Sequence, residues 1–349
     1  MPVLEGATKG PGTSIGDGFR VPDGARLLGP NFPIQKKSPP AHMPSGDGWI
    51  AFFAVDGDVP AVYDALIEQA RHGGATDIPR AAGACVYDVE YTRPSTGTST
   101  AHQAARSEHG FVALDGSPIV GAEAINREGR SPHTYSLRCE GEGSLTNGKT
   151  AKIFVRRGGI ARDPYNFGGA GGGVGFESIA ELVVSNAPID RPNGSSPFES
   201  VPSAVRRRVT SRGKGASVPA PPKPAATPRL PEPGAPLMGG YAEATIEKGS
   251  KPVAPPFGNV CHGGFTVVLE LGSDPQSVLT AYEQQLAAFL KSPREEDAGK
   301  PPTVEKQTID GASVTTITAY GLNAALKVIA VVPSKGAAYL LLNGCDIDR

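Results

Sequence analysis

Residues 49–66 read WIAFFAVDGDVPAVYDAL, and residues 265–282 read FTVVLELGSDPQSVLTAY. Each stretch contains a largely apolar run, a short turn with glycine, an aspartate, and then a pattern with helical spacing. Three aligned pairs are identical: Asp58 and Asp274, Val62 and Val278, and Ala65 and Ala281. Because the order of physical types matches throughout, the sequence predicts two halves built on the same strand–helix unit.

The second copy shows the alternation of a β-strand, in which successive side chains point to opposite faces. Its odd positions are apolar and two of its even positions are polar: Phe265, Val267, Leu269 and Leu271 against Thr266 and Glu270. This alternation predicts a strand with one wetter face. Asp274 is predicted to cap the following helix, with Pro275 at its first position. Asp58 takes the same place in the first copy.

Strand patterns follow each helix. In the second half they cover 303–308, 313–320, 324–332 and 337–342, and Asp310-Gly311 predicts a tight hairpin between the first two. In the first half they cover 134–139, 149–156 and 178–185, with insertions at 84–92, 93–125 and 158–175. We therefore predict an α+β fold of two related domains. Each would be a mainly antiparallel, twisted sheet of about four strands (strand–helix–strand–strand–strand) with one helix packed on a face.

Composition divides the chain of 349 residues, which is longer than a single core usually supports. Residues 1–20 are rich in glycine and proline and predict a disordered N-terminal lead. The first domain is predicted over 21–186 and the second over 237–349. Between them, the proline- and arginine-rich residues 187–236 predict an extended linker.

The four cysteines fall two in each half, at Cys85 and Cys139 and at Cys261 and Cys345. No two are close enough in sequence for a metal knuckle or a redox motif. The even split predicts the disulfides Cys85–Cys139 and Cys261–Cys345, and hence an oxidising compartment. Cys261 precedes the first strand of its half and Cys345 follows the last, so the two would meet if those strands are antiparallel neighbours. Four buried free thiols are the alternative.

Two further groups of residues are candidate sites. A basic cluster in the linker is a candidate for binding an anionic partner: Arg206, Arg207, Arg208, Arg212 and Lys214. A solvated linker is the alternative. The first-half insertions contain weak candidates for metal ligands: His102, Glu108, His109 and His133. Surface histidines explain them as well, so the sequence predicts no metal, cofactor or catalytic residue.

One motif has a structural explanation. Asp56-Gly57-Asp58 is similar to the start of a calcium loop, but the later acidic positions and the final glutamate are missing. In the second copy only the last aspartate recurs, which is where a helix cap is needed. We therefore interpret Asp58 as a cap.

Charge and hydropathy narrow the class of partner. The net charge of −1 makes nucleic acid an unlikely target. The longest apolar runs are strand-sized, so no transmembrane segment is predicted, and the first residues lack the pattern of a signal peptide. The composition is similar to that of exported proteins and lipoproteins of GC-rich actinobacteria. We expect a mature extracytoplasmic chain, secreted or lipid-anchored, with a cytoplasmic location as the alternative.

These observations favour a non-enzymatic, envelope-associated or secreted two-domain protein. Its partner would be an unknown protein or a cell-envelope polymer. One rival is an enzyme with a histidine and carboxylate or metal site in the first-half insertions. The other is a structural scaffold component that uses its two similar halves as docking surfaces.

Overall fold

The structure, a computed structural model, describes residues 3–4, 6–34, 47–93, 106–115, 117–120, 134–158, 177–186, 230–239, 242–257, 264–292, 295 and 300–346. Its helices are α1 (Val59–His72), α2 (Ala81–Ala84) and α5 (Pro275–Phe289). The strands of the first half are β1 (Thr8–Lys9), β2 (Ser14–Gly16), β3 (Phe19–Arg20), β4 (Ala25–Leu28), β5 (Phe32–Ile34), β6 (Gly48–Val55), β7 (Cys85–Arg93), β8 (Arg106–Ala113), β9 (Pro118–Val120), β10 (Thr134–Ser144), β11 (Thr150–Gly158) and β12 (Glu177–Ser185). Those of the second half are β13 (Pro236–Gly239), β14 (Ala242–Thr245), β15 (Ser250–Pro252), β16 (Phe265–Leu271), β17 (Thr303–Ile309), β18 (Ala312–Tyr320), β19 (Ala324–Val332) and β20 (Ala338–Asp346).

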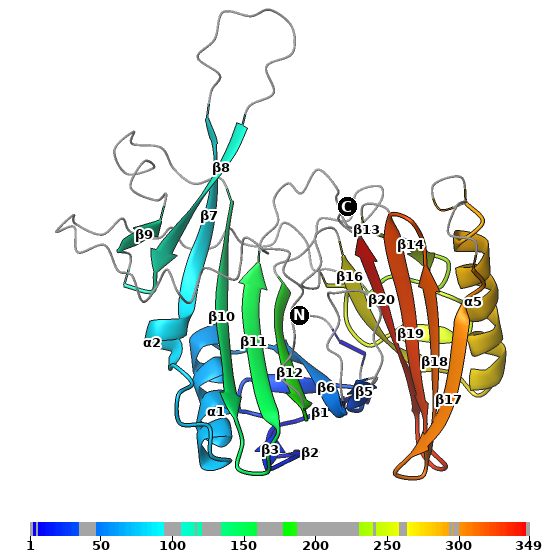
Figure 1. The fold of residues 1–349 in the computed structure, drawn as a ribbon, viewed down its shortest axis with the longest axis horizontal. Coiled ribbons are helices and arrows are strands. Elements are labelled where there is room, and N and C mark those ends of the chain that lie inside the picture. The colour runs from blue at the N-terminus through cyan, green and yellow to red at the C-terminus, as the bar shows by residue number, and fades with distance from the viewer. Residues whose placement is uncertain are drawn as a thin grey trace, which may run out of the picture.

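Two antiparallel sheets form the body of the molecule (Figure 1). The first sheet has the order β1-β4-β6-β12-β11-β10-β7-β8-β9, with β5 also paired to β6. The second sheet has the order β15-β16-β20-β19-β18-β17. The prediction of a mainly antiparallel α+β protein is confirmed. The prediction of about four strands per sheet is wrong, because short entry strands and the segment around β8 and β9 extend the sheets.

The central strands of the two sheets follow the same order. In the first sheet it is β6-β12-β11-β10-β7, and in the second it is β16-β20-β19-β18-β17. In both, the helix follows the first strand and the last strand of the half returns to pair with that first strand. The insertion predicted at 84–92 is therefore wrong: this segment is β7, which holds the position that β17 holds in the second sheet.

Local sequence signals account for the ends of these elements. The Asp58 carboxylate accepts a hydrogen bond from the N–H of Ala61 at 3.3 Å, and Asp274 accepts one from Ser277 at 3.1 Å, so both predicted caps are confirmed. The hairpin between β17 and β18 turns at Asp310 and Gly311, whose φ angles are 48° and 78°. Positive φ at both central residues is the geometry that Asp-Gly favours.

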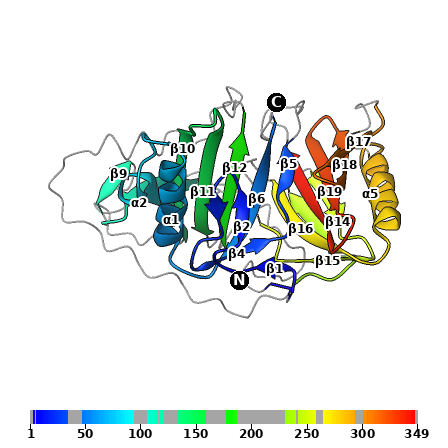
Figure 2. The same cartoon turned by 90° about the horizontal axis from the view of Figure 1, so that it is seen from below.

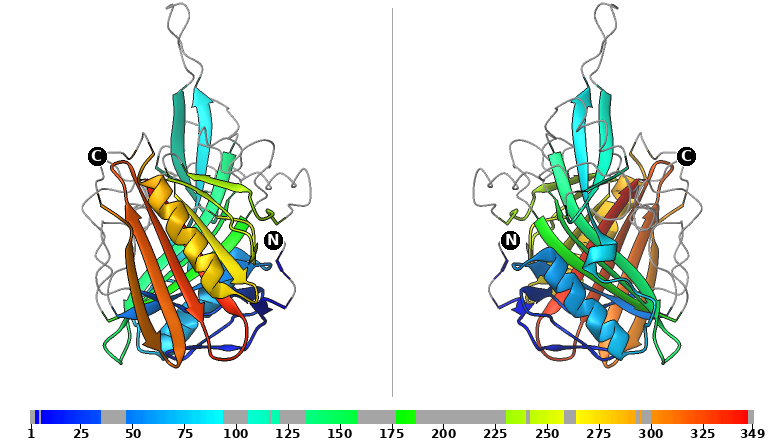
Figure 3. Two further views of the ribbon diagram at one scale, coloured as in Figure 1. Left: turned by 90° about the vertical axis from the view of Figure 1, so that its right-hand side faces the viewer. Right: turned by 90° about the vertical axis from the view of Figure 1, so that its left-hand side faces the viewer.

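The two main helices lie on opposite outer faces of the molecule, with both sheets between them (Figure 2). Figure 3 shows α5 across the second sheet and α1 across the first. The apolar side of α1 packs over β10 and β11 of the first sheet, where Ile153 and Val155 are fully buried, and α5 packs over β18 and β19 of the second sheet. The described helices include none that is long and apolar enough to cross a membrane.

A third core, the inter-sheet core, joins the faces of the sheets that point away from α1 and α5. Its buried members come from both halves: Ala7, Leu28, Phe32, Ile34, Ile50, Phe52, Ala54, Ile179 and Val183 with Val253, Ala254, Phe257, Val268, Val314, Ile329, Val331 and Leu341. Phe52 contacts Phe257 across the junction, with ring centroids 5.4 Å apart. The expectation of a wetter face on residues 265–271 is therefore wrong, because Val268 belongs to the inter-sheet core and Thr266 is 2% exposed.

The N-terminal lead predicted over 1–20 as disordered is folded over its described part, residues 3–4 and 6–20. β1 pairs with β4, and β2 and β3 form a small hairpin. Phe19 is buried in the first core, where it contacts Trp49. The sequence did not predict these strands, because glycine-rich turns separate apolar residues that are too few to show a period. Farther along, Ala235 packs on the second core and β13 begins at Pro236, so the end of the predicted linker is folded as well; residues 187–229 lie outside the described residues.

A polar contact around Asp17 fastens the N-terminal segment to the first sheet. Its carboxylate accepts hydrogen bonds from Trp49 Nε1 at 2.7 Å, Lys149 Nζ at 2.7 Å and Asn147 Nδ2 at 3.1 Å. Burial raises the pKa of Asp17, but the bonds from Lys149 and Trp49 outweigh it, and the net effect is a pKa below the usual value.

This contact predicts a pH-dependent signal from Trp49, the one tryptophan of the chain. Because the folded-state pKa of Asp17 is depressed, its stabilising contribution is present above the unfolded value of 3.8 and is lost as the pH falls below it. We expect the tryptophan fluorescence to change in this range, before global unfolding. In Asp17→Asn, which keeps an acceptor and tolerates the positive φ of 49°, the change should be absent. A similar change in this variant would contradict the assignment.

Candidate functional site

The Asp56-Gly57-Asp58 turn is a structural junction. The Asp56 carboxylate forms two hydrogen bonds with the Arg26 guanidinium, at 2.6 and 2.9 Å. The carbonyl of Gly24 accepts from the backbone N–H groups of Asp56 (2.8 Å) and Gly57 (2.9 Å). Since Asp58 caps α1, each of the three residues has a role in holding β4, β6 and α1 together. Within the described ranges, no group of three or more His, Cys, Asp or Glu residues is placed to hold a metal ion.

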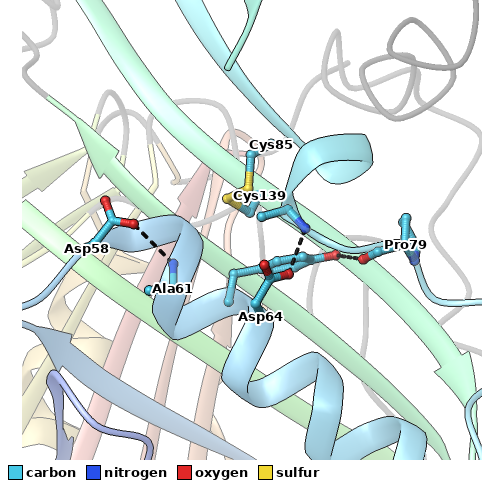
Figure 4. Close-up of a disulfide and its surroundings, with 8 residues drawn as sticks. Asp58, Ala61, Asp64, Pro79, Cys85 and Cys139 are labelled. Carbon is cyan, nitrogen blue, oxygen red and sulfur yellow. Dashed lines mark hydrogen bonds between the residues drawn. A yellow bond between two sulfur atoms is a disulfide. The ribbon is translucent and has the colours of Figure 1, made fainter. Parts of the chain in front are cut away.

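The disulfide Cys85–Cys139 joins two neighbouring strands of the first sheet (Figure 4). The two residues are directly opposite in the register of β7 and β10, which confirms the predicted pairing. Their side chains are 1% and 0% exposed, on the face that packs under α1 and α2. Such a bond is closed to solvent and reductants, so its role is structural.

The surroundings of the disulfide are also closed. The Tyr63 hydroxyl donates a hydrogen bond to the carbonyl of Pro79 at 3.0 Å, and the Asp64 carboxylate accepts one from the N–H of Ala81 at 2.7 Å, where α2 begins. Burial, with a smaller effect of Asp64, raises the pKa of Tyr63 far above its usual value. A neutral, buried phenol serves here as a structural donor.

For the second predicted disulfide, Cys261–Cys345, the structure describes only Cys345. β16 and β20 are antiparallel neighbours, with Phe265 opposite Gly344. This is the strand arrangement that the predicted disulfide requires. Cys345 is disulfide-bonded. Cys261 lies outside the described residues, and Cys261–Cys345 therefore stays a prediction.

The other candidate residues are only partly placed. Glu108 and His109 occupy neighbouring positions of β8, opposite Tyr91 and Glu90 of β7 in the register. His102 and His133 lie outside the described residues, and so does the basic cluster of Arg206, Arg207, Arg208, Arg212 and Lys214. The metal site and the basic cluster therefore stay predictions.

A row of polar side chains crosses the inter-sheet face of the second sheet. In register it runs from β16 to the edge strand β17: Thr266, Asn343, Lys327, Thr318 and Thr303. We call these five residues the polar row. The next row along the same face contains Val268, Leu341 and Ile329 of the inter-sheet core. The polar row therefore lies at the border of that core.

Lys327 is the central residue of the polar row and is 3% exposed. Burial lowers its pKa to about 8, and the field of the Glu305 carboxylate opposes this only in part. The amine is therefore still mainly a cation at pH 7. Holding a cation at this degree of burial costs free energy. Lysines whose pKa is lowered by burial occur at binding and catalytic sites as well as in structural ion-pair networks.

Next to Lys327, the Asn343 side chain is oriented by a hydrogen bond. The Thr266 hydroxyl donates to Asn343 Oδ1 at 2.7 Å. In the described part of the chain, Asn343 makes no other side-chain hydrogen bond, so its Nδ2 group is available as a donor. Thr318 flanks Lys327 on the opposite side and is also buried. The row thus presents a cation between an amide donor and a hydroxyl.

The corresponding face of the first sheet carries charges. Lys152 Nζ lies 3.2 Å from Glu140 Oε1, and both side chains are largely buried. Arg138 of β10 and Arg156 of β11 are directly opposite each other in the register. Like charges in this position repel unless other groups compensate them. We call these four residues the charged block.

The sequence contained a signal for Lys327 that was not interpreted as a site. Residues 324–332 read AALKVIAVV, in which one lysine interrupts an apolar run. Aligned with 150–155, TAKIFV, this lysine corresponds to Lys152. The structure places both on faces turned away from the helices. The apolar run predicts a strand that is buried on both faces. Because lysine is almost never fully buried unless it is paired, a lysine inside such a run is the signal that could have identified Lys327.

Comparisons with known proteins give no assignment. No family model and no curated protein matches the chain. Among solved structures, the tesB protein of Mycobacterium avium subsp. paratuberculosis is 8% identical, with 96% of this chain and 100% of that chain covered and a TM-score of 0.15. A monomeric dehydratase domain of a trans-AT polyketide synthase is 7% identical over 81% and 88%, with a TM-score of 0.13. An inactive CurK dehydratase mutant is 6% identical over 87% and 94%, also with 0.13. TM-scores this low carry no argument.

Proposed function

We propose that this chain is a non-catalytic binding protein that works in an extracytoplasmic, oxidising setting. The observation that carries the proposal is the buried disulfide Cys85–Cys139 between directly opposed residues of β7 and β10. Disulfides of this kind persist where thiols are not kept reduced, and are rare in the cytosol. The partner would be a protein or a polymer of the cell envelope.

We further propose that the two halves arose by duplication of one strand–helix–sheet unit and form related domains. In support, the central strands follow the same order in both sheets, an aspartate caps the helix in each, and a lysine occupies corresponding strands. The inter-sheet core makes the pair a single body in which each half covers a face of the other. Function in such a protein is expected where the halves differ, and this includes the basic cluster.

Thiol mapping of protein purified from its native host tests the compartment. We expect peptides that contain Cys85 and Cys139 to be linked under non-reducing conditions, and Cys261 to be linked to Cys345. Alkylation with a thiol reagent before any reduction should leave all four unlabelled. Four labelled thiols in freshly lysed cells would overturn the proposal.

A metal assay on the same preparation tests the non-catalytic part. We expect no zinc or other transition metal in stoichiometric amount. Stoichiometric metal that is lost in His102→Ala or His133→Ala would instead support an enzyme with a site in the first-half insertions.

A further inference from the structure

The edge strand β17 is exposed along its length. It is the last strand of the second sheet, where it pairs with β18 on one side and with no strand that the structure describes on the other (Figure 1). Residues 303–308 are all exposed. Among the described residues, Val304 is the one exposed large apolar side chain, at 37%. In the first sheet, by contrast, the strand in this position, β7, pairs on its outer side with β8.

β17 lacks most of the features that protect an edge strand from further pairing. Such protection comes from short length, a bulge, proline within the strand, or charged side chains. The register of β17 with β18 is regular over all seven residues of the strand, and proline stands only before it, at Pro301 and Pro302. A partner strand can therefore lie along the full length of this edge.

The hairpin at the end of β17 determines which of its backbone groups point outward. Ile309 and Ala312 flank a two-residue turn with positive φ at both positions, so they form a hydrogen-bonded pair. Because hydrogen-bonded and non-hydrogen-bonded pairs alternate in an antiparallel ladder, every second residue back from Ile309 bonds to β18. The N–H and C=O groups of Val304, Lys306 and Thr308 consequently point away from the sheet. Their spacing is the one that an added strand requires.

The side chains of these three residues indicate the chemistry of the partner. They lie on the face of the sheet that carries the second core, because Val304 is opposite Ile317 in the register. An added antiparallel strand would continue the pairing found throughout this sheet. In such a strand, the residue opposite Lys306 precedes the residue opposite Val304 by two positions. An acidic residue at the first place and an aliphatic residue at the second give favourable cross-strand pairs.

A second copy of β17 does not meet this requirement. Two copies that overlap over all seven residues pair antiparallel about the central residue, Lys306. This arrangement places the two Lys306 ammonium groups directly opposite each other, where like charges are destabilising. The occupant that fits is therefore a strand of another protein.

We propose that the outer edge of β17 binds an extended segment of a partner protein. The segment adds to the second sheet as an antiparallel strand and carries an acidic residue two positions before an aliphatic one. This proposal rests on the proposed function as a binding protein, and it names the class of partner and the place of binding. The main chain of the segment supplies the hydrogen bonds, and the residues opposite Lys306 and Val304 provide selectivity.

The test uses the full-length, oxidised protein and two synthetic peptides with blocked ends, TTETVT and TTKTVT. The readout is the backbone amide signals of Val304, Lys306 and Thr308 in ¹⁵N–¹H spectra at pH 7, during titration into the millimolar range. We expect TTETVT to cause saturable shifts of these signals. It should bind roughly threefold more tightly than TTKTVT, the effect of one exposed charge pair. Absence of a saturable shift with TTETVT, or equal affinity for both peptides, would overturn the proposal.

A charge reversal localises the binding. In Lys306→Glu the preference should reverse, so that TTKTVT binds more tightly than TTETVT. Lys248→Glu is the matched control, because it makes the same change at an exposed position just before β15, the strand at the opposite edge of the sheet. Its preference should be that of the wild type. A preference for TTETVT that persists in Lys306→Glu would contradict the assignment.

A proline variant tests the role of the main chain. Lys306→Pro removes an outward N–H but no bond to β18, so we expect a Tm close to that of the wild type and loss of binding of both peptides. Gln307→Pro removes an N–H that bonds to β18 and should lower the Tm. Binding of TTETVT to a folded Lys306→Pro with wild-type affinity would overturn the proposal. If this variant does not fold, Lys306→Glu decides. The proposed extracytoplasmic function is tested independently, since it fails on thiol mapping and not on peptide affinity.

Discussion

Replacing both Cys85 and Cys139 by alanine is expected to lower the free energy of unfolding by about 4 kcal/mol. The two residues are 54 positions apart, and the loop-entropy relation gives this value for a cross-link of that span. Both side chains are fully buried beneath α1 and α2, so the loss of packed volume adds to the effect. Urea denaturation followed by circular dichroism measures the difference.

A second variant separates the bond from the packing. Cys85→Val with Cys139→Val refills the volume without a cross-link and should recover only the packing part of the loss. The slope of the transition is expected to rise in both variants, because an unfolded chain without the cross-link exposes more surface. An unchanged midpoint in the alanine variant would contradict the pairing.

Phe52→Ala is expected to destabilise the protein by about 3–5 kcal/mol. The side chain is 2% exposed and contacts Phe32 and Phe257, one from each half. The truncation leaves a cavity between the sheets, where the surrounding residues belong to two separate sheets. We therefore expect the variant to weaken the coupling between the halves, so that calorimetry shows two unfolding transitions in place of one.

Phe53→Ala is the matched control. Phe53 follows Phe52 on β6, is equally buried, and faces α1 within the first core. Its truncation should cost a similar free energy but leave the inter-sheet core intact, so the halves should still unfold together. Two unfolding transitions in both variants, or a single transition in both, would contradict the role assigned to Phe52.

The sequence predicted those features that depend on local chemistry. Asp58 and Asp274 precede helical patterns with proline in the first turn, and both are caps. Asp310-Gly311 predicted the hairpin between β17 and β18. In each case a few neighbouring residues determine the outcome, so no knowledge of distant contacts was needed.

Features that depend on distant contacts were missed. Thr266 suggested a wetter face because nothing in its own strand indicates that this face, which carries Val268, packs into the inter-sheet core. β7 was interpreted as an insertion because its partner, β10, follows after a long interval. Phe19 is anchored by Trp49 from another strand. The sequence shows Lys327 as a lysine in an apolar run, but its position between Asn343 and Thr318 follows only from the pairing of neighbouring strands.

The burial of the Cys85–Cys139 bond also has a consequence for the order of events during folding. Once α1 and α2 cover the sheet, neither sulfur is within reach of an oxidant, since both side chains are inaccessible. The bond therefore forms before or while β7, β10 and the helices come together. Oxidising capacity is then required at the place and time of folding, and supplying it later, where the finished protein works, would not form the bond.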